Sequence, residues 1–235
     1  MKKLMFAAAA LTAGFAMAEI VSSDIVGYAQ NNLKSGYSLV TPQFLTVGAE
    51  AMPLQAITAI GEGTSDNVNI QTLDAAGYTV DSYLWNDWVA EKPCWVNDSF
   101  EPVEDVTFSA GQGLWVGGAS VEQGVQTAGK VGKDDVVFGL RSGYVATGNP
   151  YPVAIDLQDI IAQGEGTSDN VNIQTLDAAG YTVDSYLWND WVAEKPCWVN
   201  DSFEPVEGVT IQPGQGLWVG GSSTEQSIRF PAPEL

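Results

Sequence analysis

The sequence predicts an all-β protein made of two tandem copies of one module, and three observations support this fold class. Residues 61–104 recur at every position as residues 164–207. Short runs of β-branched and aromatic residues alternate with polar ones between Gly, Asn and Asp, as is typical of strands and turns. Helical periodicity is scarce. We therefore expect two homologous β-sandwich or small β-barrel modules, each with one short helix, after an N-terminal signal peptide.

Residues 1–18 have the order of a secretory signal peptide. Lys2 and Lys3 precede an apolar run, and small residues end at Ala18, where we expect cleavage. The apolar run is shorter than the roughly 20 residues that a membrane-spanning helix needs. We therefore expect a secreted chain without a membrane span, located in the periplasm, at the cell surface or in the extracellular medium.

The similarity between the copies extends beyond the identical block. Upstream, residues 33–44 match residues 140–151 if four residues are gapped. Downstream, residues 106–123 match residues 209–226 more loosely than the identical block. We place the boundary at Gly132, inside a polar segment, so that copy 1 spans residues 19–132 and copy 2 spans residues 133–235. Each copy has an ordinary domain length. Because both copies present the same surface, two equivalent sites would gain avidity if both could engage.

The first predicted pair of strands within each copy forms a hairpin. Residues 67–73 alternate with the period of a half-buried strand, and residues 78–85 are rich in aromatic and β-branched side chains. The loop between them, residues 74–77, contains Gly77, which can adopt a positive φ.

The next predicted elements are short. Asn86 and Asp87 form a tight turn before the chain returns at Trp88, and Pro93 limits residues 94–96 to a short or edge strand. Residues 114–118 and their equivalents at 217–221 form later strands, which would add to a neighbouring sheet if they were unpaired.

One short helix is expected in each copy. Residues 53–60 and 157–163 can each form one or two helical turns. Asp156 would cap the second helix and Gly164 would end it.

These motifs resemble a set of uncharacterised secreted bacterial proteins. Their modules carry GYxLV, then a Trp-containing hairpin, then PGxGLWV or a close variant. The matching segments here are residues 36–40, 85–88 and 110–116, and in copy 2 residues 143–145, 188–191 and 213–219. Copy 2 has VAT in place of SLV, and copy 1 lacks the Pro of the turn. The resemblance implies a β module on exported proteins and carries no known active site.

Three of the four tryptophans of each copy gather in one short window and are candidates for ligand binding. A flat aromatic face suits the C–H surface of a sugar ring, and neighbouring Asn and Asp side chains can bind its hydroxyls. The candidate residues are Trp85, Asn86, Asp87, Trp88 and Trp95, with Trp188, Asn189, Asp190, Trp191 and Trp198 in copy 2. The alternative is that the rings form the core, since burying one contributes up to about 4 to 6 kcal/mol. We expect Trp88 to be the most exposed because it follows a turn.

Two further features have open interpretations. An Asp- and Asn-rich segment offers oxygen atoms to a Ca²⁺ ion, or simply forms a turn. Its residues are Asp66, Asn67 and Asn69, with Asp169, Asn170 and Asn172 in copy 2. Cys94 and Cys197 are the only cysteines. They can bridge within the chain, bridge between chains or remain free thiols, and the first requires Cα atoms within about 7 Å.

Composition excludes several functions. The formal net charge is −20, which disfavours nucleic acid and anionic lipid as partners. Histidine is absent, so a Ser-His or Cys-His nucleophile is excluded. We therefore expect a non-enzymatic protein of a cell-surface or extracellular structural or adhesive assembly, whose partners are itself or other matrix components. The alternative is a pair of carbohydrate-binding modules that use the Trp-rich surfaces to bind glycans. No cofactor is expected except the possible Ca²⁺.

Overall fold

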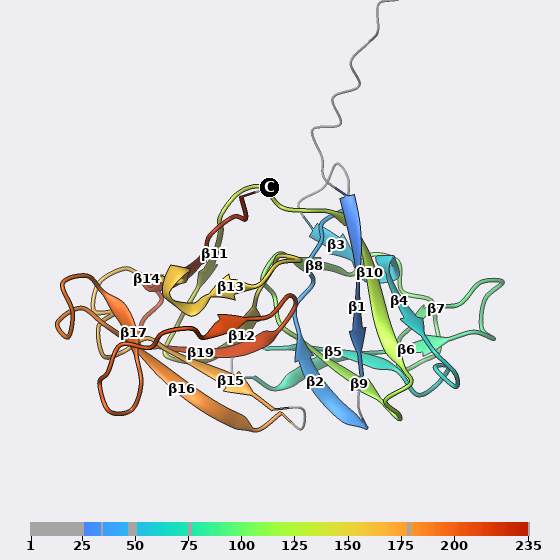
Figure 1. The fold of residues 1–235 in the computed structure, drawn as a ribbon. Helices are drawn as coiled ribbons and strands as arrows, with labels where there is room; N and C mark the ends of the chain where they lie inside the picture. The colour runs from blue at the N-terminus through green and yellow to red at the C-terminus, as the bar shows by residue number, and fades with distance from the viewer. Residues whose placement is uncertain (1–25, 34, 47–50, 75–76, 178–179, 235) are drawn as a thin grey trace, which may run out of the picture.

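The computed structural model describes residues 26–33, 35–46, 51–74, 77–177 and 180–234. The protein is all-β, with several antiparallel sheets in two similar sets that lie side by side (Figure 1). The predicted signal peptide, residues 1–18, lies outside the described residues. Among the described residues, no helix has the length and apolar character that a membrane crossing requires.

The first set contains a five-stranded sheet in the order β2-β9-β5-β6-β7, a three-stranded sheet in the order β1-β10-β4, and the pair β3-β8. Its strands are β1 (Val26–Asn32), β2 (Gly36–Val40), β3 (Ala51–Pro53), β4 (Ile57–Ile60), β5 (Asn69–Leu73), β6 (Thr79–Asn86), β7 (Cys94–Val96), β8 (Thr107–Ser109), β9 (Leu114–Gly118) and β10 (Gly124–Lys130).

The second set repeats this topology, with sheets β12-β19-β15-β16-β17, β11-β20-β14 and β13-β18. Its strands are β11 (Val136–Gly139), β12 (Gly143–Gly148), β13 (Ile155–Asp156), β14 (Ile161–Gln163), β15 (Asn172–Leu176), β16 (Thr182–Asn189), β17 (Cys197–Val199), β18 (Thr210–Ile211), β19 (Gly216–Gly221) and β20 (Ser227–Phe230).

Each set buries its own hydrophobic core. On β6, Tyr83 and Trp85 face inward with Leu84 on the opposite side of the sheet, which is the alternation expected of a half-buried strand. The predicted hairpin is present as β5 and β6, and Gly77 in its loop has a φ of 82°. Large aromatic residues anchor both cores, among them Trp95 and Phe108 in the first set and Trp198 and Phe230 in the second.

The predicted short helices are wrong in extent. Each is a single 3-10 turn, η1 (Leu54–Ala56) or η2 (Leu157–Asp159), and the residues after it enter β4 or β14. The Asp156 side chain does cap η2, because it accepts a hydrogen bond from the Gln158 amide at 2.9 Å. The β-branched residues Ile57 and Ile161 begin the following strands, where backbone pairing with β10 or β20 replaces further helical turns.

Residues 114–118 and 217–221, whose pairing is open from the sequence, are paired on both sides. β9 lies between β2 and β5, and β19 lies between β12 and β15, so both are central. The outer edges are β7 and β17. The side chain of Gln55 covers the first of these edges, since it accepts a hydrogen bond from the Trp95 amide and donates one to the Trp95 carbonyl. Gln158 does the same for Trp198, which protects both edges from pairing with another chain.

Candidate functional site

The structure separates the clustered tryptophans into buried and exposed rings. Trp95 is fully buried at 0% exposure and Trp85 is buried beside it, with ring centroids 5.1 Å apart in an edge-to-face arrangement. Trp88 is 62% exposed. The equivalent residues Trp198, Trp188 and Trp191 divide in the same way. Of the three candidate rings in each copy, only one is therefore available to a ligand.

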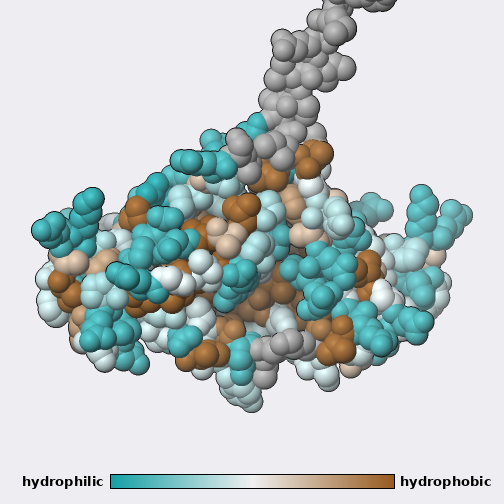
Figure 2. Space-filling view, viewed as in Figure 1, coloured by the Kyte–Doolittle hydropathy of each residue, from teal (hydrophilic) through white to brown (hydrophobic). Residues whose placement is uncertain are grey.

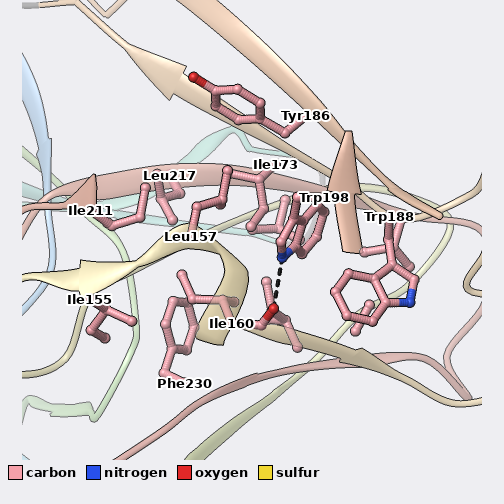
Figure 3. Packing of buried hydrophobic residues seen from close by; sticks show 14 of the residues in the cluster. Ile155, Leu157, Ile160, Ile173, Tyr186, Trp188, Trp198, Ile211, Leu217 and Phe230 are labelled. Atoms are coloured by element: carbon pink, nitrogen blue, oxygen red, sulfur yellow. Dashed lines mark hydrogen bonds between the residues drawn. The ribbon is translucent and has the colours of Figure 1, made fainter. Parts of the chain in front are cut away.

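The buried ring is fixed by a hydrogen bond in the core. The indole N–H of Trp95 donates to the carbonyl oxygen of Ile57 at 2.7 Å. Figure 3 shows the equivalent bond in the second set, where Trp198 points its nitrogen at the carbonyl of Ile160 and Trp188 lies beside it. This bond satisfies the polar edge of a buried indole, so these rings serve as core anchors.

The exposed ring of Trp88 is also fixed, although it lies in the loop between β6 and β7. Its indole N–H donates to Oδ2 of Asp66 at 3.1 Å. The other carboxylate oxygen of Asp66 accepts from Nδ2 of Asn86 at 2.9 Å. Oδ1 of Asn86 in turn accepts from the backbone amides of Trp88 and Val89. Asn86 is buried, so its role is to hold the loop and not to contact a ligand.

Phe100 completes this exposed aromatic surface. Its ring lies 5.5 Å from that of Trp88, centroid to centroid, with 32° between the ring planes, and 44% of the residue is exposed. Asn97 shapes the turn that delivers it, because Oδ1 of Asn97 accepts from the amides of Ser99 and Glu101. We call Trp88 and Phe100 the first aromatic shelf.

Trp191 and Phe203 form the second aromatic shelf. Their ring centroids are 5.6 Å apart with the same angle of 32°, and the indole N–H of Trp191 donates to Asp169 at 3.0 Å. Asn189 is buried and bonds to Asp169 and to the backbone amides of the loop, as Asn86 does. The two shelves are therefore equivalent in chemistry and in shape.

The backbone is strained at the residues that support the shelves. Among the described residues, the only non-glycine positions with positive φ are Asp66 and Phe100, at 60° and 58°, and their equivalents Asp169 and Phe203, both at 59°. A left-handed conformation costs about 1 to 2 kcal/mol for a residue with a Cβ, and it is rare for a bulky side chain. All four of these residues contact Trp88 or Trp191. Strain that persists at an exposed position points to a functional surface.

Charged side chains are exposed in the loops that carry each shelf. Asp87, Glu91, Lys92 and Asp98 are exposed in the two loops that carry the first shelf. Carboxylates of this kind accept hydrogen bonds from hydroxyl groups, and an ammonium group donates hydrogen bonds to them. The surroundings of each shelf therefore suit a ligand that combines an apolar face with many hydroxyls.

The structure uses the proposed Ca²⁺ residues separately. Both oxygen atoms of Asp66 already accept hydrogen bonds from Asn86 and Trp88, and Nδ2 of Asn67 donates to two backbone carbonyls. Asn69 lies on β5, where its Oδ1 is buried without a hydrogen-bond partner among the described residues. The equivalents Asp169, Asn170 and Asn172 are arranged in the same way. Within the described ranges, no group of three or more His, Cys, Asp or Glu residues is placed to hold a metal ion.

Cys94 and Cys197 are free, half-buried thiols. They begin β7 and β17, the outer edges of two different sheets, which lie at opposite ends of the molecule (Figure 1). Of the three thiol states open from the sequence, the structure therefore does not form a bridge within the chain.

Two residues that build or support the first shelf were not predicted from the sequence for that role. Phe100 stands outside the tryptophan window, and its only sequence signal is its place after the turn formers Asn97 to Ser99. The sequence offers Asp66 as a Ca²⁺ ligand or a turn residue, whereas in the structure its side chain anchors Trp88. No family model, no curated protein and no solved structure matches this chain.

Proposed function

We propose that this chain is an exported, non-enzymatic protein of a cell-surface or extracellular assembly, and that it attaches to neutral polysaccharide through its two aromatic shelves. The observation that carries the proposal is the fixed, exposed ring of Trp88, together with its equivalent Trp191. A buried ring would serve the core, and a freely moving exposed ring would lose conformational entropy on binding. The ring of Trp88 is exposed, so a ligand can reach it, and it is already fixed, so it loses little conformational entropy on binding.

The ligand class follows from shape and charge. The flat face of an indole matches the C–H face of a sugar ring, and the exposed charged side chains of the same loops can form hydrogen bonds with the hydroxyls. The formal net charge of −20 repels anionic polymers, which favours a neutral glycan.

The surface around the shelves supports a ligand with a small footprint. On the face shown in Figure 2, hydrophilic side chains cover most of both ends of the molecule, and the exposed hydrophobic residues form small, separate patches. A stable protein–protein interface buries about 800 Å² on each partner around an apolar centre. A single pair of rings is too small for that and is suited to a sugar unit.

The expected affinity of one shelf is low. Covering about 100 to 150 Å² of aromatic surface contributes about 3 to 4 kcal/mol, which corresponds to a dissociation constant in the millimolar range. Useful attachment therefore requires both shelves and a polymer that presents many sites.

Retention on insoluble cellulose, chitin, starch and mannan tests the proposal. The wild-type protein should be retained on at least one of these polymers, and the double variant Trp88→Ala/Trp191→Ala should not. The matched control is Tyr78→Ala/Tyr181→Ala, which removes two equally exposed equivalent rings outside the shelves and should leave retention unchanged. Absence of wild-type retention on all four polymers, or equal retention of the double variant, would overturn the proposal.

Sedimentation of the same samples distinguishes binding to a glycan from binding to a second copy of the chain. If the shelves bind another copy of the chain, the wild type should self-associate and the double variant should not. Shelf-dependent self-association without retention on any polymer would replace the glycan with a second copy of the protein.

A further inference from the structure

We infer that the two aromatic shelves are held at a fixed spacing at opposite ends of the molecule, so that one protein molecule links two separate polysaccharide chains. The inference rests on the proposed function for the nature of the ligand. Its geometric basis lies in the junction between the two sets of sheets and in the direction of β6 and β16.

The junction is reciprocal. The ring of Trp115, on β9, reaches Gly180 of the second set, and the ring of Trp218, on β19, reaches Gly77 of the first set. The two indole rings meet each other with centroids 6.4 Å apart. Contacts in which each residue and its equivalent exchange roles are the signature of a two-fold axis, and a simple translated repeat would not produce them.

The glycines allow this close approach. A Cβ at Gly77 would lie 2.9 Å from the ring of Trp218, and a Cβ at Gly180 would lie 2.8 Å from the ring of Trp115. Both glycines also have a φ of 82°. A larger residue would therefore meet both a steric clash and an unfavourable backbone conformation at the junction.

Hydrogen bonds fix the angle between the two sets. The Gly113 amide donates to the Ala146 carbonyl at 3.2 Å, and the Thr41 amide donates to the Gly214 carbonyl at 3.0 Å. The hydroxyl of Thr147 donates to the Gly111 carbonyl at 2.6 Å in a buried position. Directional bonds in addition to the ring contacts restrict the junction, unlike a flexible tether between two modules.

Strand direction places each shelf far from this junction. β6 starts at Thr79, just after Gly77 at the junction, and runs for 8 residues to Asn86, beside Trp88. At roughly 3.3 Å per residue this strand covers about 25 Å. β16 starts beside Gly180 and repeats the path, and Figure 1 shows β6 and β16 running to opposite ends. The shelves are therefore on the order of 50 Å apart.

The two-fold relation decides between one bound chain and two. A polysaccharide chain has a direction, from one chemically distinct end to the other. Rotation by 180° about an axis perpendicular to the line between the shelves reverses direction along that line. One straight chain that lay along both shelves would meet the second in the wrong orientation, whereas two separate chains can each bind a shelf in the same way.

The native cysteines provide a test of the geometry without any ligand. Cys94 pairs with Asn86 at the end of β6, and Cys197 pairs with Asn189 at the end of β16, so each thiol marks the position of a shelf. Spin labels on these two thiols should give a narrow distance distribution centred on the order of 50 Å. A distance below about 30 Å, or a broad distribution, would overturn the inference.

Cross-linking of a soluble, long-chain form of the retained polysaccharide is the functional test. Wild-type protein should give turbidity that rises and then falls as protein is added, because excess protein saturates the chains singly. Trp88→Ala and Trp191→Ala each leave one shelf, so each variant should still bind a short oligosaccharide but should produce no turbidity. Wild-type binding without turbidity would overturn the linking role alone, and no binding at all would overturn the proposed function as well.

Discussion

The indole N–H of Trp88 donates a hydrogen bond to Oδ2 of Asp66 at 3.1 Å, and Trp191 and Asp169 form the same bond at 3.0 Å. Asp66 and Trp88 are 22 residues apart in the chain. This bond fixes the orientation of an exposed tryptophan ring that lies in a loop. The geometry of the aromatic shelves therefore depends on a carboxylate that itself need not touch the ligand.

Replacing Asp66 should weaken ligand binding by releasing Trp88. Asp66→Ala removes the acceptor and keeps a Cβ at positive φ, so we expect a loss of about 1 to 2 kcal/mol in the free energy of unfolding. Because useful attachment requires both shelves, Asp66→Ala in the otherwise wild-type chain should reduce polymer retention nearly as far as Trp88→Ala does. Asp66→Asn keeps one acceptor oxygen and a residue that tolerates positive φ, but its NH2 group faces the other of the two donors, so its binding should lie between that of the wild type and that of Asp66→Ala. Urea unfolding and polymer retention measure the two effects, and full retention by Asp66→Ala would show that the anchor is dispensable.

The buried and the exposed tryptophans should lose different amounts of stability on substitution by Phe. Trp95→Phe leaves the Ile57 carbonyl without its donor and opens space in the core, which should lower the free energy of unfolding by about 3 kcal/mol. Trp88→Phe should lower it by less than about 1 kcal/mol, because the ring is largely exposed. Denaturant unfolding curves compare the variants, and similar losses in both would contradict the assignment of core and shelf.

Two substitutions of Phe100 separate the effect of losing the ring from the effect of the strained backbone. Phe100→Gly and Phe100→Ala both remove the ring, so both should reduce ligand binding to the same extent. Phe100→Gly should be more stable than Phe100→Ala by about 1 kcal/mol, because glycine adopts a φ of 58° without a Cβ clash. Chemical denaturation measures this difference, and equal stability would show that the backbone is not strained there.

Substitution of Gly180 tests the junction, and Gly208 provides a matched control. Gly180 and Gly208 have similar positive φ values of 82° and 73°, but only Gly180 lies against a tryptophan ring. Both substitutions to Ala carry a backbone penalty of about 1 kcal/mol. Gly180→Ala should cost more than Gly208→Ala and should broaden the distance distribution between labels on Cys94 and Cys197. Identical behaviour of the two variants would show that the contact with Trp115 does not hold the junction.

The buried hydroxyl of Tyr151 should make the protein less stable at high pH. Burial raises the pKa of Tyr151 to about 12, from its ordinary value of 10.0. Since the folded-state pKa is raised, its stabilising contribution is complete below pH 10 and is lost as the pH rises from 10 towards 12. Tyr151→Phe should remove this part of the pH dependence while Tyr83 and Tyr186, whose pKa values are also raised by burial, keep theirs.

The matched residue in the first set makes that substitution conservative. Phe44 occupies the equivalent position and is buried as Tyr151 is. The cost at neutral pH is the hydrogen bond from the Tyr151 hydroxyl to the Asp134 carbonyl, about 1 kcal/mol. Thermal melts from pH 8 to 11 measure the effect, and an unchanged slope in the variant would contradict it.

Local features of the fold were predictable because short-range chemistry controls them. The alternation at residues 67–73 predicted β5, the loop glycine predicted a positive φ, and Asp156 predicted a cap. The exposure of Trp88 followed from its place after a turn. In each case neighbouring residues supply the physical cause.

Features that depend on distant pairing were not predictable. The strand order places β9 between β2 and β5, neither of which precedes or follows it directly in sequence, so its central position has no local signal. The same holds for the bond between Trp88 and Asp66 and for the contact between Trp115 and Gly180. A positive φ at Phe100 is contrary to its intrinsic preference, and only the surrounding structure imposes it.

The most direct test of the central claim is a titration of the protein with a short oligosaccharide of the retained polymer, followed by calorimetry and tryptophan fluorescence. The wild type should bind two oligosaccharides per chain with the same weak affinity, since the shelves are equivalent. Trp88→Ala and Trp191→Ala should each bind one, and the double variant should bind none. Undiminished binding by the double variant, or no binding by the wild type to any oligosaccharide of the four polymers, would contradict the claim that the aromatic shelves bind polysaccharide.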